Sequence, residues 1–447
     1  MAKVAFIEPS SSFNSYGYYR FPLMGSLCLG TILKEAGHDV QIFRDNVKSV
    51  YIKSKEWLHE AIVHADVVAI SVMTSTANRA YQIADAIRKL APKIKIIMGG
   101  PHVTYMSEEA AQHADLVVKG EGEEIILEAV NNPNLTGIVQ GPPVNDLNKY
   151  PIPDLSLLSE KNLPPRQAPI STSRGCPFDC IFCTVSSTFG RKCRFRDPES
   201  VVEEIYKRKT EGYKRAFFYD DNFAINKERT KIMLEGMIRK NIKIKWSAEA
   251  RSDIAKDKEL LKLMSKSNCT RMFIGFESVN PKTLDVYNKK QKIEDIKTCI
   301  KNLHEHGIKV HGMFVLGSDE DDSNTPKETI KFCREMNIDS AQFSILHPLP
   351  GSRLYDILES ENRIFTKNWS LYDGSHVVFN PKKISPIELQ EKFFWLWKKF
   401  YSIRNPLYFA IARYVISNWH KSNKQALMDL KKRFSSAIEK TNLIKKG

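Results

Sequence analysis

Short apolar runs alternate with helical patterns along the first 130 residues of the chain. The apolar runs are KVAFIEP, HDVQIF, DVVAISV, KIKIIMGG and DLVVKG, and helical periodicity separates them near residues 27–36, 55–64 and 77–90. Nearly continuous apolar strands that alternate with helices are typical of a parallel sheet covered by helices on both faces. We therefore predict a doubly wound, Rossmann-like α/β domain over residues 1–135.

A second alternation of strands and helices covers residues 167–365. Its six strand-like runs are APISTSR, RAFFYDDNF, KIKWSAEAR, RMFIGFES, KVHGMFVLG and DSAQFSILHP. This pattern predicts a partial β/α barrel, in which polar groups at the carboxyl ends of the strands carry the chemistry. Residues 136–166 are rich in Pro and Asn and are predicted to form a linker. Residues 366–447 are predicted to form a helical, basic C-terminal domain.

The composition is that of an ordinary globular protein, with 42% hydrophobic and 27% charged residues among 447. No apolar run of about 18 residues occurs, and the first residues, MAKVAFIEPSSS, lack the apolar core of a signal peptide. The eight cysteines, three of them in one motif, suit a reducing compartment better than a disulfide framework. We therefore expect a cytoplasmic protein without a transmembrane helix.

Most of the net charge of +15 lies near the C-terminus. Residues 398–446 contain twelve Lys and Arg against two acidic residues, a surplus of ten. An aromatic-rich run, FFWLWKKFYSIRNPLYFAIARYVISNW, overlaps this region, and Pro406 divides it into two helices. Such helices either pack into a core with a solvated basic face, or form an amphipathic surface. The latter would receive a hydrophobic substrate and rest peripherally on anionic lipid at the inner membrane face.

Three cysteines in the segment STSRGCPFDCIFCTVSS, namely Cys176, Cys180 and Cys183, give the strongest chemical signal. A structural zinc site needs four ligands, and the only nearby fourth cysteine, Cys193, has no partner arm. Thiolates also hold iron–sulfur clusters, and three cysteines on a four-iron cluster leave one iron open to a substrate. The spacing therefore favours a [4Fe-4S] cluster over a zinc site or plain core cysteines.

The CxxxCxxC spacing, with Phe182 directly before the third cysteine, resembles the signature of the radical S-adenosylmethionine (SAM) superfamily. This resemblance implies that the three cysteines bind the cluster, that SAM chelates the open iron, and that Phe182 lies in the loop that passes the adenine. It also implies that an electron donor such as flavodoxin or ferredoxin reduces the cluster.

Polar residues at the predicted strand ends would complete the SAM site by the same resemblance. Asp220 and Asp221 would meet the amino group of SAM. Arg251, beside Glu249, would pair with the carboxylate, because a guanidinium matches that geometry. Glu277 and Ser278 would face the ribose, and Gly317 would let the backbone approach the adenine. Each of these residues could instead make an ordinary strand-end hydrogen bond.

The segments MGGPHVT and KGEGEE resemble the cobalamin-binding domain that precedes many radical SAM domains. The cobalamin contacts implied by this resemblance are Thr74, Ser75, Gly99, Gly100, His102, Gly120 and Glu121. The sequence lacks the DxHxxG motif that supplies a lower axial histidine in many cobalamin proteins. We therefore expect cobalamin without a histidine on cobalt. A flavodoxin-like domain that binds no cofactor is the alternative.

The two-domain order implies a cobalamin-dependent radical SAM methyltransferase that acts on an unactivated carbon of a lipid, tetrapyrrole or natural product. Trp369, Tyr372, Asp373 and His376 resemble the segment after the barrel in such enzymes that act on lipids and tetrapyrroles. His347, at the end of the sixth strand, is a further candidate for contact with substrate or cofactor. A close alternative is a cyclase or carbon–carbon coupling enzyme that transfers no methyl group.

Two other functions are less compatible with the sequence. RNA methylthiotransferases share the domain order but need three further N-terminal cysteines, whereas this chain has only Cys28 there. A non-enzymatic iron–sulfur or cobalamin sensor could bind nucleic acid through the basic tail. No segment resembles a known nucleic-acid-binding module, so we expect no nucleic-acid partner.

Overall fold

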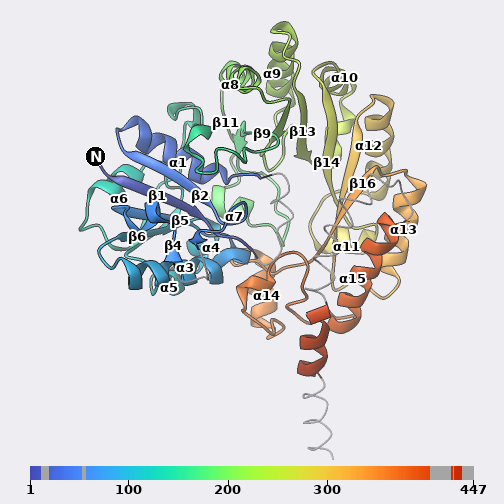
Figure 1. Cartoon of the computed structure of the whole chain (residues 1–447). Coiled ribbons are helices and arrows are strands. Elements are labelled where there is room, and N and C mark those ends of the chain that lie inside the picture. The colour runs from blue at the N-terminus through green and yellow to red at the C-terminus, as the bar shows by residue number, and fades with distance from the viewer. Residues whose placement is uncertain (12–19, 53–56, 403–423, 426, 435–447) are drawn as a thin grey trace, which may run out of the picture.

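The structure is a computed structural model and describes residues 1–11, 20–52, 57–402, 424–425 and 427–434. The chain forms two α/β units, each built on a sheet of parallel strands. The units lie side by side, with the N-terminal unit in blue and the second unit in green to orange (Figure 1). Pro406, the predicted helix that follows it and most of the basic tail lie outside the described residues.

The N-terminal unit is a doubly wound sheet of six parallel strands in the order β2-β1-β5-β6-β7-β8. Alternate residues of β1 face opposite layers: Ala5 and Ile7 enter one apolar cluster, whereas Val4 and Phe6 enter another. This two-faced burial explains the continuous apolar strands and confirms the predicted fold. The strands are β1 (Lys3–Glu8), β2 (Asp39–Arg44), β5 (Val67–Ser71), β6 (Lys95–Gly99), β7 (Leu116–Gly120) and β8 (Gly137–Gly141).

Helices and short elements surround this first sheet. Strand β8 lies within the predicted linker, yet pairs with β7 from Leu116↔Gly137 to Gly120↔Gly141. The first sheet therefore extends past residue 135. The helices are α1 (Met24–Glu35), α2 (Glu60–Val63), α3 (Ala77–Leu90), α4 (Pro101–Tyr105), α5 (Ser107–Ala110) and α6 (Ile126–Asn131), with η2 (Thr74–Thr76), η3 (Leu147–Lys149), η4 (Leu155–Leu157) and the hairpin β3 (Tyr51–Ile52) and β4 (Trp57–Leu58).

The second unit is an open barrel of six parallel strands that follow one another in chain order. On β15, Val310, Phe314 and Leu316 are buried, whereas His311 and Met313 on the opposite face are partly exposed. This alternation confirms the predicted partial barrel. Its strands are β9 (Ala168–Ile170), β12 (Arg215–Phe218), β13 (Lys245–Ala250), β14 (Cys269–Glu277), β15 (Lys309–Leu316) and β16 (Ser340–Ile345), and its helices are α8 (Pro198–Thr210), α9 (Lys227–Arg239), α10 (Lys258–Lys266), α11 (Pro281–Val286), α12 (Ile293–Glu305) and α13 (Thr325–Glu335), with η5 (Ser252–Lys256).

A short insertion after β9 carries the three-cysteine motif. The antiparallel ribbon of β10 (Ser173–Arg174) and β11 (Arg194–Phe195) flanks it, and α7 (Val185–Phe189) follows the last cysteine. The ribbon therefore holds both ends of the cysteine loop beside the N-terminal unit.

Beyond the barrel come α14 (Arg353–Ser360), η6 (Trp369–Leu371) and α15 (Pro386–Tyr401). The aromatic residues of α15 pack against β16: Trp397 Nε1 donates to the Phe343 carbonyl at 3.0 Å, and the Tyr401 hydroxyl donates to the Ala341 carbonyl at 2.5 Å. In this part of the aromatic-rich run, the core interpretation is therefore correct. Among the described residues, no helix is long and apolar enough to cross a membrane.

Candidate active site

The three cysteines of the motif lie together in the loop between β10 and α7, and all three are half-buried free thiols. Burial raises the pKa of Cys183 to about 11, and the charges of Cys180 and Cys176 add to this effect. Burial likewise raises the pKa of Cys176. A nearby cation stabilises the thiolate form of such cysteines, and the irons of a cluster supply this positive charge.

This donor set fits an iron–sulfur cluster better than a single metal ion. Among the described residues, no three His, Cys, Asp or Glu side chains converge on one metal position. In a four-iron cluster each cysteine binds a different iron, so the sulfurs need not converge. Cys193 donates its thiol to the Gly175 carbonyl at 3.5 Å, which is a contact within the loop.

Arg251, which follows β13, points its guanidinium at this loop. Its Cζ lies 3.7 Å from the centroid of the Phe178 ring, and its Nη1 lies 4.0 Å from the sulfur of Cys180. Nη2 donates to the carbonyl oxygen of Lys289, and the whole residue is 8% exposed. The guanidinium thus contacts the cluster loop and Lys289, whereas its Nε has no hydrogen-bond partner among the described residues. Contact of Arg251 with the SAM carboxylate stays a prediction.

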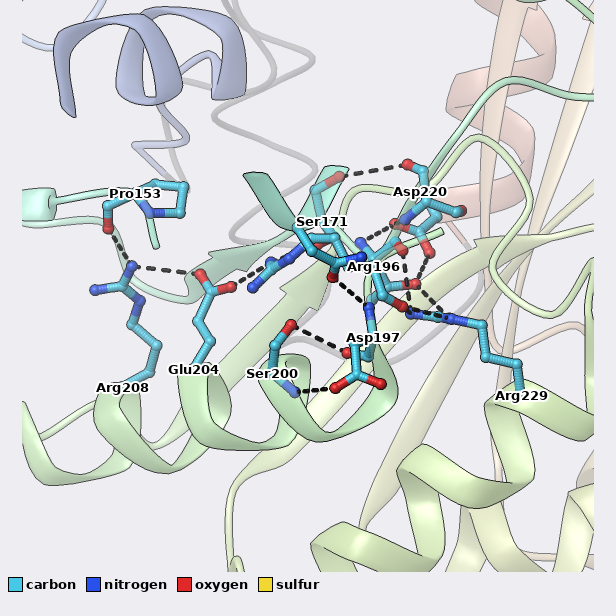
Figure 2. Close-up of polar contacts among 12 residues, drawn as sticks. Pro153, Ser171, Arg196, Asp197, Ser200, Glu204, Arg208, Asp220 and Arg229 are labelled. Atoms are coloured by element: carbon cyan, nitrogen blue, oxygen red, sulfur yellow. Dashed lines mark hydrogen bonds and ion pairs between the residues drawn. The ribbon is translucent and has the colours of Figure 1, made fainter. Parts of the chain in front are cut away.

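Asp220, two residues after β12, is hydrogen-bonded to the segment just before the cysteines. Its carboxylate accepts the backbone N–H groups of Thr172 at 2.6 Å and Ser173 at 3.1 Å, and also the Thr172 hydroxyl. Arg229 of α9 donates to the Thr172 hydroxyl at 3.2 Å and to its carbonyl at 3.1 Å (Figure 2). Asp220 therefore positions the segment that leads to Cys176.

A second buried network fixes the same segment from the side of α8. Glu204 accepts hydrogen bonds from Arg196 at 2.5 Å and Arg208 at 3.4 Å (Figure 2). Arg196 also donates to the Ser171 carbonyl at 2.8 Å, and Arg208 donates to the Pro153 carbonyl. Glu204 and Arg208 are fully buried, so each charge depends on its partner.

Three carboxylates lie at the carboxyl ends of the neighbouring strands β12, β13 and β14. Burial, with the negative charges of Asp221 and Glu277, raises the pKa of Glu249 to about 7. The surrounding protein atoms, which limit solvation of the carboxyl group, and the charge of Asp220 raise the pKa of Asp221 to about 6, although the residue as a whole is exposed. Raised pKa values are frequent among the carboxylates of functional sites. A bound cation would relieve this repulsion.

Glu277 is partly neutralised by a lysine that sequence reasoning missed. Nζ of Lys289 donates to Oε1 of Glu277 at 2.6 Å, and both residues are buried. A Cβ on Gly275 would lie 2.5 Å from that oxygen and 3.0 Å from Nζ, so this glycine makes room for the ion pair. The run NKKQK gave no signal for this role, because it has the composition of a surface turn.

The remaining barrel candidates make local contacts. The Ser278 hydroxyl accepts the Asn280 N–H at 3.1 Å, and the Gly317 N–H donates to Asp321 at 2.9 Å. Gly317 has a φ of 108°, which requires glycine. Phe182 meets the ring of Tyr287 edge-on at 5.0 Å, beside the cysteine loop. Direct contact of these residues with SAM remains a prediction.

The cobalamin candidates Thr74, Ser75, Gly99, Gly100 and Gly120 lie at the carboxyl edge of the first sheet. Gly100 has a φ of 108°, and a Cβ there would lie 2.9 Å from the Val72 carbonyl oxygen. Gly120 has a φ of 79°. Ligands of doubly wound sheets bind at this edge, so these residues fit a cobalamin site, and their contacts with it remain predictions.

Glu121 joins the two units. Its carboxylate accepts from Arg194 Nη2 at 2.5 Å, from Arg174 at 2.8 Å and from the Val144 N–H at 2.9 Å. Burial raises the pKa of this carboxyl, but the hydrogen bond from Arg194 and the charge of Arg174 outweigh burial and lower it. Arg174 also pairs with Glu123 at 2.7 Å. The described contacts assign Glu121 to the interface, not to an open cofactor site.

His102 is likewise enclosed at the interface. It is 1% exposed, its ring centroid lies 5.0 Å from that of Trp369, and neither ring nitrogen has a hydrogen-bond partner among the described residues. Burial lowers its pKa to about 4, so it is neutral at pH 7. Trp369 donates its indole N–H to Glu109 at 2.8 Å. The segment after the barrel thus covers His102, which sequence reasoning placed at the cofactor.

The other residues of this segment are also engaged in buried contacts. His347 lies 3.1 Å from the Leu371 carbonyl, and burial lowers its pKa, so the ring donates to that oxygen as a neutral imidazole. Nδ1 of His376 lies 2.9 Å from Asp373. These contacts give both histidines a role in packing the segment between the barrel and the first unit.

The fold and the site define a class of enzyme with two cofactor-binding units: a doubly wound domain is held beside the cysteine loop of an open β/α barrel by ion pairs. Comparison with known families agrees, because residues 170–348 match the radical SAM superfamily and residues 16–130 match the B12 binding domain.

Known proteins resemble this chain over most of its length. The chain is 30% identical over 346 residues to bacteriochlorophyllide d C-12(1)-methyltransferase of Chlorobaculum tepidum, covering 75% of each protein. It is 28% identical over 404 residues to the anaerobic magnesium-protoporphyrin IX monomethyl ester cyclase of Cereibacter sphaeroides, covering 83% of this chain and 65% of that one. The fold is similar to the structure of the cobalamin-dependent S-adenosylmethionine radical enzyme OxsB, with a TM-score of 0.68 and 16% identity. The match covers 96% of this chain and 72% of the OxsB chain.

The chain therefore belongs to the cobalamin-dependent radical SAM enzymes. Its cofactors are a [4Fe-4S] cluster, SAM and cobalamin. Cys176, Cys180 and Cys183 are the residues that would hold the cluster.

Proposed function

We propose that this protein is a C-methyltransferase that acts on an unactivated carbon of a hydrophobic substrate. The observation that carries the proposal is the clamp between the two cofactor-binding units: Arg174, two residues before Cys176, pairs with Glu121 and Glu123 of the B12-binding unit. When bound, SAM on the cluster supplies the radical that removes a hydrogen atom, and cobalamin supplies the methyl group.

The residues of this chain support those cofactors in separate ways. The three cysteines bind the cluster, and the guanidinium of Arg251 places positive charge beside Cys180. The carboxylates of Asp221 and Glu249 attract the cationic amino end of SAM. The pair of Glu277 and Lys289 keeps a third carboxylate in place without adding net negative charge. An external reductant such as flavodoxin or ferredoxin would reduce the cluster.

The inner face of the barrel supports a hydrophobic substrate. Phe217, Phe273 and His311 form a continuous aromatic surface, with ring centroids 5.5 and 4.5 Å apart. Phe21 of the first unit closes against Phe217 at 5.2 Å and Tyr219 at 5.4 Å. Burial lowers the pKa of His311 to about 3, so this surface carries no imidazolium charge at pH 7. These aromatic rings favour a planar or hydrophobic molecule, and the charges of Arg271 and Glu249 lie beside them.

Product analysis under anaerobic conditions tests the proposal. The protein with its reconstituted cluster and cobalamin is incubated with SAM, a strong reductant and a hydrophobic cell extract. We expect both S-adenosylhomocysteine and 5'-deoxyadenosine, with the first requiring cobalamin. The match to a cyclase favours a second function, carbon–carbon ring closure. Formation of 5'-deoxyadenosine without S-adenosylhomocysteine would support that function and contradict methyl transfer.

A further inference from the structure

A basic surface covers the C-terminal halves of α8 and α9 and the amino ends of β12 and β13. Residues 203–215 and 235–245 contain nine Lys and Arg against four Glu, a surplus of five. We call this region the α8–α9 surface. Its exposed or half-exposed cations are Lys207, Lys209, Lys214, Arg215, Arg239, Lys240, Lys243 and Lys245.

The acidic residues nearby neutralise little of this charge. Glu204 is fully buried and pairs with Arg208, and the exposed Glu211 also pairs with Arg208 instead of a surface cation. Glu235 is exposed as well. Glu203 pairs with Lys240. The cations at the strand ends thus remain as an excess of positive charge.

Like charges also face each other at the amino ends of the strands. Arg215 and Lys245 are register partners on the neighbouring strands β12 and β13. The Lys245 N–H donates to the carbonyl of Lys214 at 3.1 Å, which brings a third cation to the same edge. Like charges on neighbouring strands repel each other. An anionic partner would remove the repulsion.

Apolar side chains lie among these cations. Tyr206, Ile232 and Ile238 are 43%, 52% and 37% exposed. The ammonium groups of Lys209 and Lys240 lie 6.0 and 5.8 Å from the Tyr206 ring centroid. Cations that alternate with exposed aliphatic and tyrosine side chains suit a bilayer interface, where the charges meet headgroups and the apolar groups enter the acyl boundary. Nucleic-acid phosphates would be met by the cations alone.

The α8–α9 surface lies at the opposite end of the strands from the carboxylates of the candidate site. In Figure 1 the ends of α8 and α9 lie at the top of the molecule, far from α14 and α15. A partner bound there would leave the cysteine loop accessible. We propose that the α8–α9 surface docks this protein on an anionic lipid bilayer. The proposal does not depend on which carbon the enzyme attacks.

Vesicle co-sedimentation of the full chain tests this proposal. The probes are vesicles of phosphatidylcholine alone and of phosphatidylcholine and phosphatidylglycerol in equal parts. We expect binding to the anionic vesicles only, and loss of binding as the salt concentration rises. The test variant carries Lys207→Glu, Lys214→Glu, Lys240→Glu and Lys243→Glu. Because each basic residue near a bilayer strengthens binding several-fold, we expect this variant to bind about a thousandfold more weakly.

A matched variant reverses the same number of charges at the other basic region: Lys398→Glu, Lys424→Glu, Lys431→Glu and Lys432→Glu, all at exposed positions. We expect it to bind anionic vesicles as the unmodified protein does. Circular dichroism and thermal unfolding verify that both variants fold. Loss of vesicle binding in the C-terminal variant alone would overturn the proposal. Binding to duplex RNA without binding to anionic vesicles would also overturn it and would identify a nucleic-acid surface instead.

Discussion

At the scale of single residues, contacts between distant parts of the chain decide the role of each strand-end group. Asp220, Arg251 and Glu121 were all predicted to touch a cofactor, because polar residues follow strands in both units. Their partners lie 48, 71 and 73 residues away, at Thr172, Cys180 and Arg194. A single sequence places residues at strand ends, but it does not show which side chain will meet another loop. The cysteine motif could be predicted because its spacing is local.

Replacement of Cys180 should abolish the cluster, whereas replacement of Cys193 should not. The Cys180→Ala variant removes a thiolate that we propose binds one iron, and we expect loss of iron, sulfide and the visible absorption after anaerobic reconstitution. Cys193→Ala removes only a contact with the Gly175 carbonyl at 3.5 Å. Equal iron contents in the two variants would contradict the assignment.

Arg251 should tune the cluster through its charge. A cation next to a cluster sulfur favours the reduced, more negative state, so Arg251→Gln should make the midpoint potential more negative. Arg251→Lys keeps the charge but not the stacking on Phe178, and should restore most of the potential. Redox titration followed by electron paramagnetic resonance measures both. An unchanged potential in Arg251→Gln would show that this residue acts on loop packing alone.

The affinity for SAM should rise with pH through the range of about 6 to 7, where Asp221 and Glu249 ionise. Their pKa values are raised in the absence of a ligand, and a cation binds better to the ionised carboxylates, so binding releases protons and strengthens as the pH rises. Glu249→Gln should weaken binding about tenfold at pH 8 and flatten the profile. Equilibrium dialysis with SAM at several pH values measures this, and a pH-independent affinity in the unmodified protein would contradict it.

At the scale of elements, hydrophobic alternation was sufficient to predict both sheets. The apolar clusters on the two faces of β1 and the alternation on β15 are what the sequence pattern implies. Strand β8, with the sequence GIVQG, was missed because four of its five residues are exposed or half-exposed at the sheet edge. The register shift between Gly275 and Glu277, where β14 pairs with β15, was also missed, and Glu277 has a φ of 61° there.

Gly275 should be intolerant of even a methyl group. In Gly275→Ala the new Cβ would lie 2.5 Å from Oε1 of Glu277, which forces the buried pair with Lys289 to move. Overpacking of this kind costs about 1–3 kcal/mol in the free energy of unfolding, which urea denaturation measures. The matched change Gly25→Ala, in α1, meets no atom within 4 Å and should leave stability unchanged or raise it. Equal stability of the two variants would refute the packing argument.

At the scale of the whole molecule, buried charges hold the two units together. Glu121 and Arg194 are 5% and 8% exposed and come from opposite sides of the interface. The sequence could predict the two domains and their order, because each has its own period and motif. It could not predict the interface, since Glu121 and Glu123 lie in a segment, KGEGEE, that equally suits a ligand loop.

Glu121→Ala should loosen this interface. The substitution leaves Arg194 buried without its carboxylate, and removing one partner of a buried pair costs about 3–5 kcal/mol. Glu124→Ala removes the exposed pair with Lys149 and should cost about 0–1 kcal/mol. Thermal unfolding and limited proteolysis compare the two variants. A larger loss of stability in Glu124→Ala would exclude Glu121 as the clamp.

The transfer of an isotopically labelled methyl group tests the central claim most directly. The holoenzyme is incubated anaerobically with SAM deuterated at the methyl group, a reductant and a hydrophobic extract, and the extract is then analysed by mass spectrometry. The account predicts a new species that carries the label on carbon and that requires both cobalamin and Cys180. If 5'-deoxyadenosine accumulates while no labelled species forms and the extract yields a product two hydrogens lighter, the enzyme closes or couples carbon skeletons, and methyl transfer is wrong.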